Sequence, residues 1–250
     1  MRDMETDRNL IERLPETAST NTYLKQLCRE RILPEGYTVY TDRQTAGRGQ
    51  RGNSWESEPG MNITMTLLLR PVHIPIREQF RISQVVALGV TDILGRETDG
   101  FSIKWPNDIY WHDKKIAGIL IENTLSGTEY SEAIVGIGLN VNQRQFVSDA
   151  PNPVSLRQIT GHDYDLGALL RQLVEAIHIR YEQSKSPAHT LHAEYMERLY
   201  RRDGFYRYST PGGEIFEARV AAIEPDGFLC LEKRTGEMSR FAFKEVSFLL

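Results

Sequence analysis

The chain has 250 residues, of which 40% are hydrophobic and 26% charged, and its formal net charge is −4. This composition is that of a soluble globular protein and gives no global reason to bind nucleic acid. No apolar run approaches the roughly 18 residues of a membrane-spanning helix, and the charged N-terminus is unlike a secretory signal, so we expect a cytoplasmic protein without membrane contact. The two cysteines and six histidines lack metal-ligand spacing, so we expect no metal site built by the protein.

The first predicted elements are a helix and a strand. Residues 16–30 place hydroxyl residues ahead of an apolar stripe, which is typical of an N-capped amphipathic helix with Ser19 and Thr20 at its mouth. Residues 36–42 then predict a strand that leads into the next loop, because they are rich in β-branched and aromatic residues.

Residues 45–57, TAGRGQRGNSWES, are here called the glycine loop. They show neither helical nor strand periodicity, so they cannot be a core element. Glycines let the backbone approach a ligand closely, and arginines supply forked donors for phosphate or carboxylate. Taken alone, the segment is either an anion-binding loop or a solvated surface turn.

Strand and helix signals continue after the glycine loop. Residues 61–70 predict a strand, and residues 77–98 predict a helix that covers the core with one face. Residues 101–125 predict a strand, a break at Pro106, a short strand, a tight turn and a long buried strand. Residues 132–142 predict a further strand.

Gly136 and Gly138 interrupt that last strand and face the same side, because alternate residues of a strand share a face. Glycine weakens a strand interior. The pair therefore indicates either a place where a ligand lies flat against the sheet or a β-bulge.

The C-terminal part changes from helical to strand texture. Residues 165–183 and 188–200 predict two amphipathic helices, whereas short strands and glycine-containing turns from residue 204 predict a small β-barrel. We therefore expect an α+β protein with a mixed β-sheet flanked by helices at 1–203 and a small barrel at 204–250 that docks on it.

Three of these stretches carry ligand-type residues: a Gly-Arg-Gly loop ending in Trp55, Lys-Trp-Pro-Asn-Asp at 104–108, and Lys-Ile-Ala-Gly-Ile-Leu at 115–120. Together and in this order they resemble the biotin protein ligases, which activate biotin with ATP and attach it to a lysine of a carrier domain. The joint occurrence is much more specific than any single motif. The resemblance runs from about Ser19 to the C-terminus and implies a sheet of the class II aminoacyl-tRNA synthetase type with an SH3-like C-terminal domain.

The resemblance implies roles for individual residues. Lys115 would hold the biotin carboxylate and later the acyl carbonyl, and Trp55 would pack on adenine. The expected biotin-binding residues are Ser19, Thr20, Gln44, Gly47, Arg48, Lys115, Gly118, Gly136 and Gly138. The expected ATP-binding residues are Gln50, Arg51, Trp55, Lys104, Asn107, Asp108 and Asn140. The expected catalytic residues are Lys115, Arg51, Lys104 and Asp108.

The chemistry accounts for these residue types. The biotin carboxylate must attack the α-phosphorus of ATP, so cations are needed to offset repulsion between the two anions. The available cations are Arg48, Arg51, Lys104 and Lys115, and Mg²⁺ is expected with ATP. In the second step a carrier lysine must lose a proton, for which Asp108 is a candidate base. Structural roles stay open: a turn cap for Asp108, a solvated lysine for Lys115 and a core position for Trp55.

The sequence also departs from the family. Gln50 stands where many members have an arginine that helps to retain the adenylate, so we expect measurable release of biotinyl-AMP. Only some fifteen residues precede the matching region, too few for the DNA-binding domain of some members, so we expect a ligase without DNA binding. The partner is expected to be a biotin carboxyl carrier protein, and a homodimer is possible because homodimers occur in the family. The glycine loop is expected to be a lid over the ligands.

Two other functions compete with this interpretation. A lipoate protein ligase would share the fold and the acyl-adenylate chemistry, but its arginine and triple-glycine signature is absent. A noncatalytic biotin-binding regulatory module would not need the phosphate-binding cations Arg51, Lys104 and Lys115. A P-loop kinase is excluded because no Gly-Lys-Ser/Thr follows a glycine-rich loop.

Overall fold

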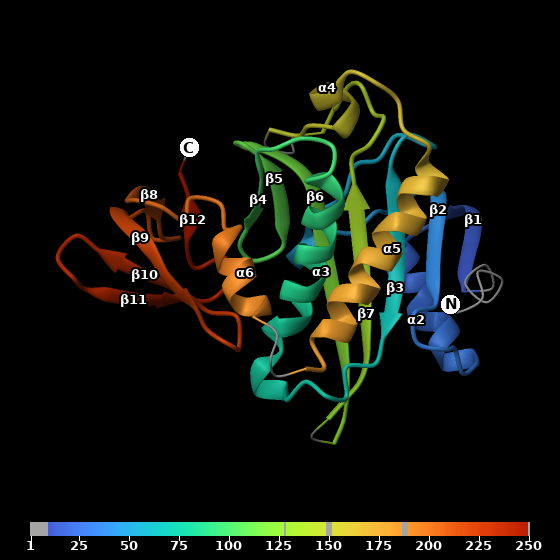
Figure 1. Ribbon diagram of the computed structural model, residues 1–250, viewed down its shortest axis with the longest axis horizontal. Helices are drawn as coiled ribbons and strands as arrows, with labels where there is room; N and C mark the ends of the chain where they lie inside the picture. The colour runs from blue at the N-terminus through green and yellow to red at the C-terminus, as the bar shows by residue number, and fades with distance from the viewer. Residues whose placement is uncertain (1–9, 128, 149–151, 187–189, 250) are drawn as a thin grey trace.

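The computed structural model describes residues 10–127, 129–148, 152–186 and 190–249 (Figure 1). It contains two β-sheets. The first sheet is built from β1 (Ile11–Thr17), β2 (Thr38–Gln44), β3 (Ile63–Leu69), β4 (Phe101–Lys104), β5 (Asp108–Trp111), β6 (Lys114–Ser126) and β7 (Glu129–Leu139). The second is built from β8 (Tyr206–Ser209), β9 (Ile215–Ile223), β10 (Leu229–Lys233), β11 (Met238–Phe241) and β12 (Ser247–Phe248). The helices are α2 (Thr20–Glu30), α3 (Phe80–Leu94), α4 (Leu156–Thr160), α5 (Leu166–Gln183) and α6 (Leu191–Glu197), with 3-10 turns η1 (Gln50–Gly52) and η2 (Ile76–Glu78).

The first sheet is mixed, as predicted. Its strand order is β1-β2-β3-β7-β6-β5-β4. β1 and β2 are parallel, and the remaining neighbours are antiparallel. A parallel pair needs a crossover between its strands, which α2 provides.

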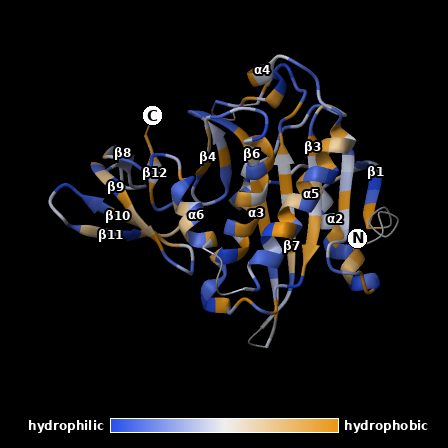
Figure 2. Ribbon diagram, viewed as in Figure 1, coloured by the Kyte–Doolittle hydropathy of each residue, from blue (hydrophilic) through white to orange (hydrophobic). Residues whose placement is uncertain are grey.

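Helices cover both faces of this sheet. Consecutive side chains of β3 point to opposite faces. Met65 and Leu67 join the large core with α3 and α5, whereas Leu68 joins a smaller core with α2. Every residue of β3 is therefore buried, and Figure 2 shows hydrophobic residues along it. Figure 1 shows α3 and α5 in front of the sheet.

The second sheet packs against the break between β4 and β5 and against the start of α3. The Trp105 indole Nε1 donates to the Gly227 carbonyl at 2.9 Å, and the Phe80 backbone N–H donates to the Pro225 carbonyl at 3.2 Å. Apolar residues of both sheets belong to one continuous hydrophobic cluster. The docking of the C-terminal strands is thus observed, while the domain boundary between residues 203 and 204 stays a prediction.

The structure confirms the predicted helices and strands where it describes them, and it adds β1, α4 and the two 3-10 turns. Residues 188 and 189 of the predicted last helix lie outside the described residues. The expectation that the helix at 77–98 covers the core with one face is wrong, because α3 is buried on nearly all sides. β1 contains Pro15 and lies at the sheet edge, where only one neighbour is needed. α4 is short, but Ser155 and Gln158 form a capping box at its start. The predicted hydroxyl cap of α2 is wrong in detail, because Ser19 occupies the N-cap position without a capping side-chain hydrogen bond. Within the described ranges, none of the helices has the length and apolarity that a membrane span requires.

Candidate active site

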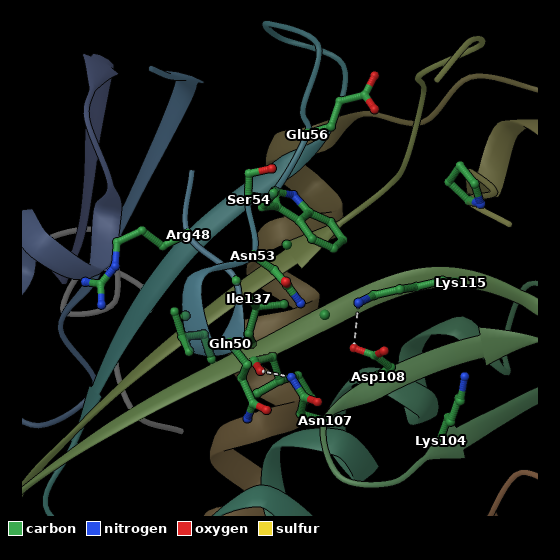
Figure 3. A pocket seen from close by; sticks show the side chains of 18 of the residues that line it. Arg48, Gln50, Asn53, Ser54, Glu56, Lys104, Asn107, Asp108, Lys115 and Ile137 are labelled. Atoms are coloured by element: carbon green, nitrogen blue, oxygen red, sulfur yellow. Dashed lines mark hydrogen bonds and ion pairs between the residues drawn. The ribbon is translucent and has the colours of Figure 1, made fainter. Parts of the chain in front are cut away.

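A cavity of about 1210 Å³ opens on the α2 side of the first sheet (Figure 3). Its floor comes from β6 and β7, its walls from the mouth of α2 and from the glycine loop, and residues 243–248 of the C-terminal segment close another side. The predicted residues that line it are Ser19, Thr20, Gln44, Arg48, Gln50, Trp55, Lys104, Asn107, Asp108, Lys115, Gly118, Gly136, Gly138 and Asn140. The Arg51 side chain lies outside the described part of the chain.

Gly47 does not belong to the described lining. Its carbonyl accepts a hydrogen bond from the Trp55 backbone N–H at 3.0 Å, and a Cβ at this position would lie 2.5 Å from the Trp55 carbonyl oxygen. The glycine is therefore required where the two arms of the glycine loop meet, rather than at the cavity surface.

The mouth of α2 forms a buried polar wall. Gln44 Oε1 accepts from the Thr20 backbone N–H at 2.9 Å and from the Thr20 hydroxyl at 3.2 Å. The Thr66 hydroxyl bonds with Thr20 Oγ1 and Asn21 Oδ1, each at 2.7 Å. The predicted neighbours Thr20 and Gln44 thus meet. Asn21 was not predicted, although its place beside Ser19 and Thr20 was a usable signal.

The glycines of β6 and β7 make room for side chains that lie on the sheet. A Cβ at Gly138 would lie 2.2 Å from Trp55 Cε2, and one at Gly118 would lie 3.0 Å from Trp55 Cζ3. A Cβ at Gly136 would lie 2.1 Å from Asn21 Oδ1. The alternative of a β-bulge is wrong here, because the pairing of β7 with β3 and β6 is regular at Gly136 and Gly138.

Two lysines and one aspartate gather where β4, β5 and β6 run side by side. Register pairs Lys104 with Asp108 and Tyr110 with Lys115, so the antiparallel meander brings these residues to one end of the cavity. Lys115 Nζ lies 2.7 Å from Asp108 Oδ1, and Figure 3 shows this ion pair facing into the cavity.

Lys104 is held in a less hydrated place. Its Nζ donates to the Tyr110 hydroxyl at 2.8 Å. Burial lowers the pKa of Lys104 below the ordinary lysine value, the charges of Lys115 and Arg201 lower it further, and Asp108 opposes them. A charged amine that is poorly solvated is ready to bind an anion, because the anion replaces the missing water.

Arg48 is not gathered with the lysines. Its guanidinium pairs with Glu122, Nη2 to Oε1, at 3.3 Å, and Figure 3 shows it pointing away from Lys115 and Asp108. Burial raises the pKa of Glu122, but the hydrogen bond from Asn21 and the nearby Arg48 and Lys25 outweigh it, so the net pKa is lowered.

Three buried polar atoms at the cavity have no hydrogen-bond partner within the described part of the chain: Gln50 Oε1, Trp55 Nε1 and Asn140 Oδ1. Asn140 is only 3% exposed, and its Nδ2 donates to the Val154 carbonyl at 3.1 Å, which orients the free oxygen. Such atoms are costly unless something satisfies them, so they indicate where a ligand donor or acceptor belongs.

Several residues that line the cavity were not predicted from the sequence. They include Asn21, Asn53, Glu56, Tyr110, Phe146, Val147, Pro153, Phe243, Val246 and Phe248. Phe146 and Val147 form an apolar pair within a polar segment, which was a usable signal. The C-terminal residues carried none, because only the docking of the second sheet brings them to the cavity.

The whole arrangement can bind a molecule that has both an apolar and an anionic part. The Trp55 ring, which lies on Gly118 and Gly138, suits a flat apolar group, the α2 mouth suits a polar head, and Lys104 and Lys115 suit carboxylate or phosphate oxygens.

Comparison with known proteins agrees with this chemistry. A family model described as the biotin/lipoate A/B protein ligase family matches residues 14–140. The bifunctional ligase/repressor BirA of Bacillus subtilis is 31% identical over 212 residues, which cover 81% of this chain and 63% of that protein. The biotin--[acetyl-CoA-carboxylase] ligase of Paracoccus denitrificans is 35% identical over 170 residues, which cover 65% of this chain and 69% of that protein. The chain therefore spans less than two thirds of the BirA relative.

A solved structure agrees over nearly the whole chain. The biotin protein ligase of Aquifex aeolicus, determined in complex with biotin and ATP, superposes with a TM-score of 0.78 at 26% identity, covering 95% of this chain and 97% of that one. With the family model spanning half of the sequence, these findings show that the chain belongs to the biotin/lipoate A/B protein ligase family.

Proposed function

We propose that the protein is an ATP-dependent biotin protein ligase that forms biotinyl-5′-AMP and transfers the biotinyl group to a lysine of a biotin carboxyl carrier domain. The observation that carries this proposal is the cavity that combines the Lys115–Asp108 pair, Lys104 and the glycine floor. The Aquifex aeolicus relative whose structure contains biotin and ATP supports it.

In the first step a biotin carboxylate oxygen would bond to the α-phosphorus of ATP, and the bond from that phosphorus to the leaving pyrophosphate would break. Lys115 would exchange its Asp108 partner for the biotin carboxylate, and Lys104 would stabilise charge on phosphate oxygens. Among the described residues no group of three or more His, Cys, Asp or Glu side chains could hold a metal ion. Mg²⁺ would enter with ATP as part of the substrate, because it binds the phosphate oxygens.

In the second step the carrier lysine nitrogen would bond to the acyl carbon, and AMP would leave with the electrons of the acyl–oxygen bond. Asp108 would take the proton that the amine loses, once Lys115 has turned to the acyl oxygen. Lys115 Nζ lies 2.7 Å from Asp108 Oδ1, which supports a shared role. Lys115 can pair first with Asp108 and then with the reacting carboxyl group.

The unpartnered atoms support the placement of the two ligands. Asn140 Oδ1 and Gln50 Oε1 would accept hydrogen bonds from the nucleotide, and Trp55 would pack on adenine. A ligand lying directly on Gly118 and Gly138 requires the Trp55 indole to move, which fits a glycine loop that closes as a lid.

The test is biotin-dependent exchange of radiolabelled pyrophosphate into ATP by the purified protein. Lipoate is the parallel acid and Lys115→Ala the control. Exchange with biotin alone, lost in Lys115→Ala, is expected. Exchange with lipoate would favour a lipoate-type ligase, and biotin binding without exchange would favour a noncatalytic biotin-binding module.

The partner and location follow as proposals. The name of the Paracoccus denitrificans relative supports a carboxylase carrier domain as the acceptor. A net charge of −4 supports the absence of DNA binding. A homodimer and a cytoplasmic location stay predictions.

A further inference from the structure

The segment of residues 143–148, here called the rim segment, lines the cavity next to the glycine loop. Phe146 and Val147 line the cavity from the rim segment, and Trp55 lines it from the glycine loop. The two walls are far apart in sequence, so something must hold them in a common geometry. Glu56, the residue after Trp55, makes the contact between them.

The Glu56 carboxylate is surrounded by donors from the rim segment. Oε1 accepts from the Val147 backbone N–H at 2.9 Å and from Gln143 Nε2 at 3.2 Å, and Oε2 accepts from the Ser148 backbone N–H at 2.9 Å. The Ser148 side chain also bonds to it. Burial raises the pKa of Glu56, but these hydrogen bonds outweigh it, so the net pKa lies below the ordinary value and the group is an anion at neutral pH.

Gln143 anchors this contact to the sheet. It is 2% exposed, and its Oε1 accepts from the Glu58 backbone N–H at 3.0 Å and from Asn62 Nδ2. Its Nε2 donates to Glu56 and to the Gln145 carbonyl. Both donors and both lone pairs of this amide are thus used, which leaves it a single orientation. The Glu56 carboxylate is therefore held at a defined place through Gln143, which bonds to Asn62 directly before β3.

Trp55 and Glu56 are neighbours in the chain, but their side chains point to different places and therefore have different roles. Ser54, which pairs with Arg48 in an isolated β-bridge, directly precedes Trp55 and Glu56, and these two side chains point in different directions. Trp55 accordingly lies on Gly138, whereas Figure 3 shows the Glu56 carboxylate pointing away from Lys115 and Asp108. Glu56 does not touch the reacting groups.

We propose that Glu56 is a positioning residue, which joins the glycine loop to the rim segment so that Trp55, Phe146 and Val147 enclose the nucleotide as one unit. This inference rests on the proposed function for the identity of the nucleotide as ATP. Without Glu56 the Val147 and Ser148 amides lose their bonds to the glycine loop, and ATP must order this part of the rim segment when it binds.

The first measurement is amide hydrogen exchange of the rim segment in the ligand-free wild type, Glu56→Gln and Glu58→Gln. Glu58 is exposed and contributes its backbone, not its side chain, to the contact, so it is the matched control. In Glu56→Gln, an NH2 group replaces one of the two carboxylate oxygens, and an NH2 group cannot accept a hydrogen bond from a rim-segment N–H. We therefore expect the Val147 and Ser148 amides to exchange at least about tenfold faster than in the wild type. Exchange equal to wild type would overturn the proposal.

The second measurement is the KM of each substrate in pyrophosphate exchange. We expect Glu56→Gln to raise the KM for ATP about tenfold, while the KM for biotin and kcat change less than about threefold. An equal rise in both KM values would show a merely structural role and overturn the proposal. If Glu56→Gln does not fold, Glu56→Asp, which keeps the charge but shortens the reach, carries the same expectations.

The two measurements separate this proposal from the proposed function. A wild type without biotin-dependent pyrophosphate exchange would refute the ligase function. Hydrogen exchange would still decide whether Glu56 holds the rim segment, because it needs no substrate.

Discussion

Asp108→Asn should lower both stability and the transfer of biotin to the carrier. Asp108 Oδ1 lies 2.7 Å from Lys115 Nζ, and the two side chains are 22% and 25% exposed. At an effective dielectric constant of about 20, charges this close attract by about 6 kcal/mol. Desolvation of the two ions offsets most of this attraction, so we expect the free energy of unfolding to fall by about 1–3 kcal/mol.

The effect on catalysis should differ between the half-reactions. If Asp108 takes the proton from the carrier lysine, the single-turnover rate of transfer from preformed biotinyl-AMP falls about 100- to 10,000-fold, whereas pyrophosphate exchange falls less than about tenfold. We expect this outcome. Equal losses in both half-reactions would show that Asp108 only positions Lys115. An unchanged transfer rate would refute the reasoning altogether, and Lys115→Ala, expected to impair both steps, is the comparison.

Three further predictions concern the cavity. Gly138→Ala places a methyl group 2.2 Å from the Trp55 ring and on the floor assigned to biotin, so we expect the KM for biotin to rise at least about tenfold, and Gly118→Ala, at 3.0 Å, to have a smaller effect; equal KM values would contradict this. Gln50→Arg should reduce escape of biotinyl-AMP, measured as less diffuse labelling of bystander proteins, and equal labelling would count against it. Because burial lowers the pKa of Lys104, the charge of Lys104 is lost as the pH rises through that lowered value. Pyrophosphate exchange should therefore decline at a lower pH in the wild type than in Lys104→Arg. Superimposable pH profiles would exclude a role of the Lys104 charge in binding phosphate.

The elements with strong periodicity were predictable because their signal is local. α5 buries an apolar stripe, α3 is apolar on nearly all sides, and β3, β6 and β7 form apolar or alternating runs. β1 was missed because its single neighbour leaves it half-exposed and weakly patterned. The glycine loop was recognisable from composition alone, since glycine and arginine in a polar run have few structural uses.

The candidate site was predictable only in part. Lys104, Asp108 and Lys115 come from one meander of three consecutive strands, so their proximity follows from short-range order along the chain. The role of Gly136 was less accessible, because it is Asn21, more than a hundred residues earlier, that lies on it.

By itself the sequence determined which residue types were available: two lysines beside an aspartate, a glycine-rich loop and alternating glycines on a buried strand. Only the tertiary structure decided that Trp55 lies on Gly138, that Glu56 reaches the rim segment, and that residues 243–248 close the cavity. These contacts depend on the strand order β1-β2-β3-β7-β6-β5-β4 and on the docking of the second sheet. No local pattern encodes such an order, because it results from the joint burial of apolar surface by segments that are distant in the chain.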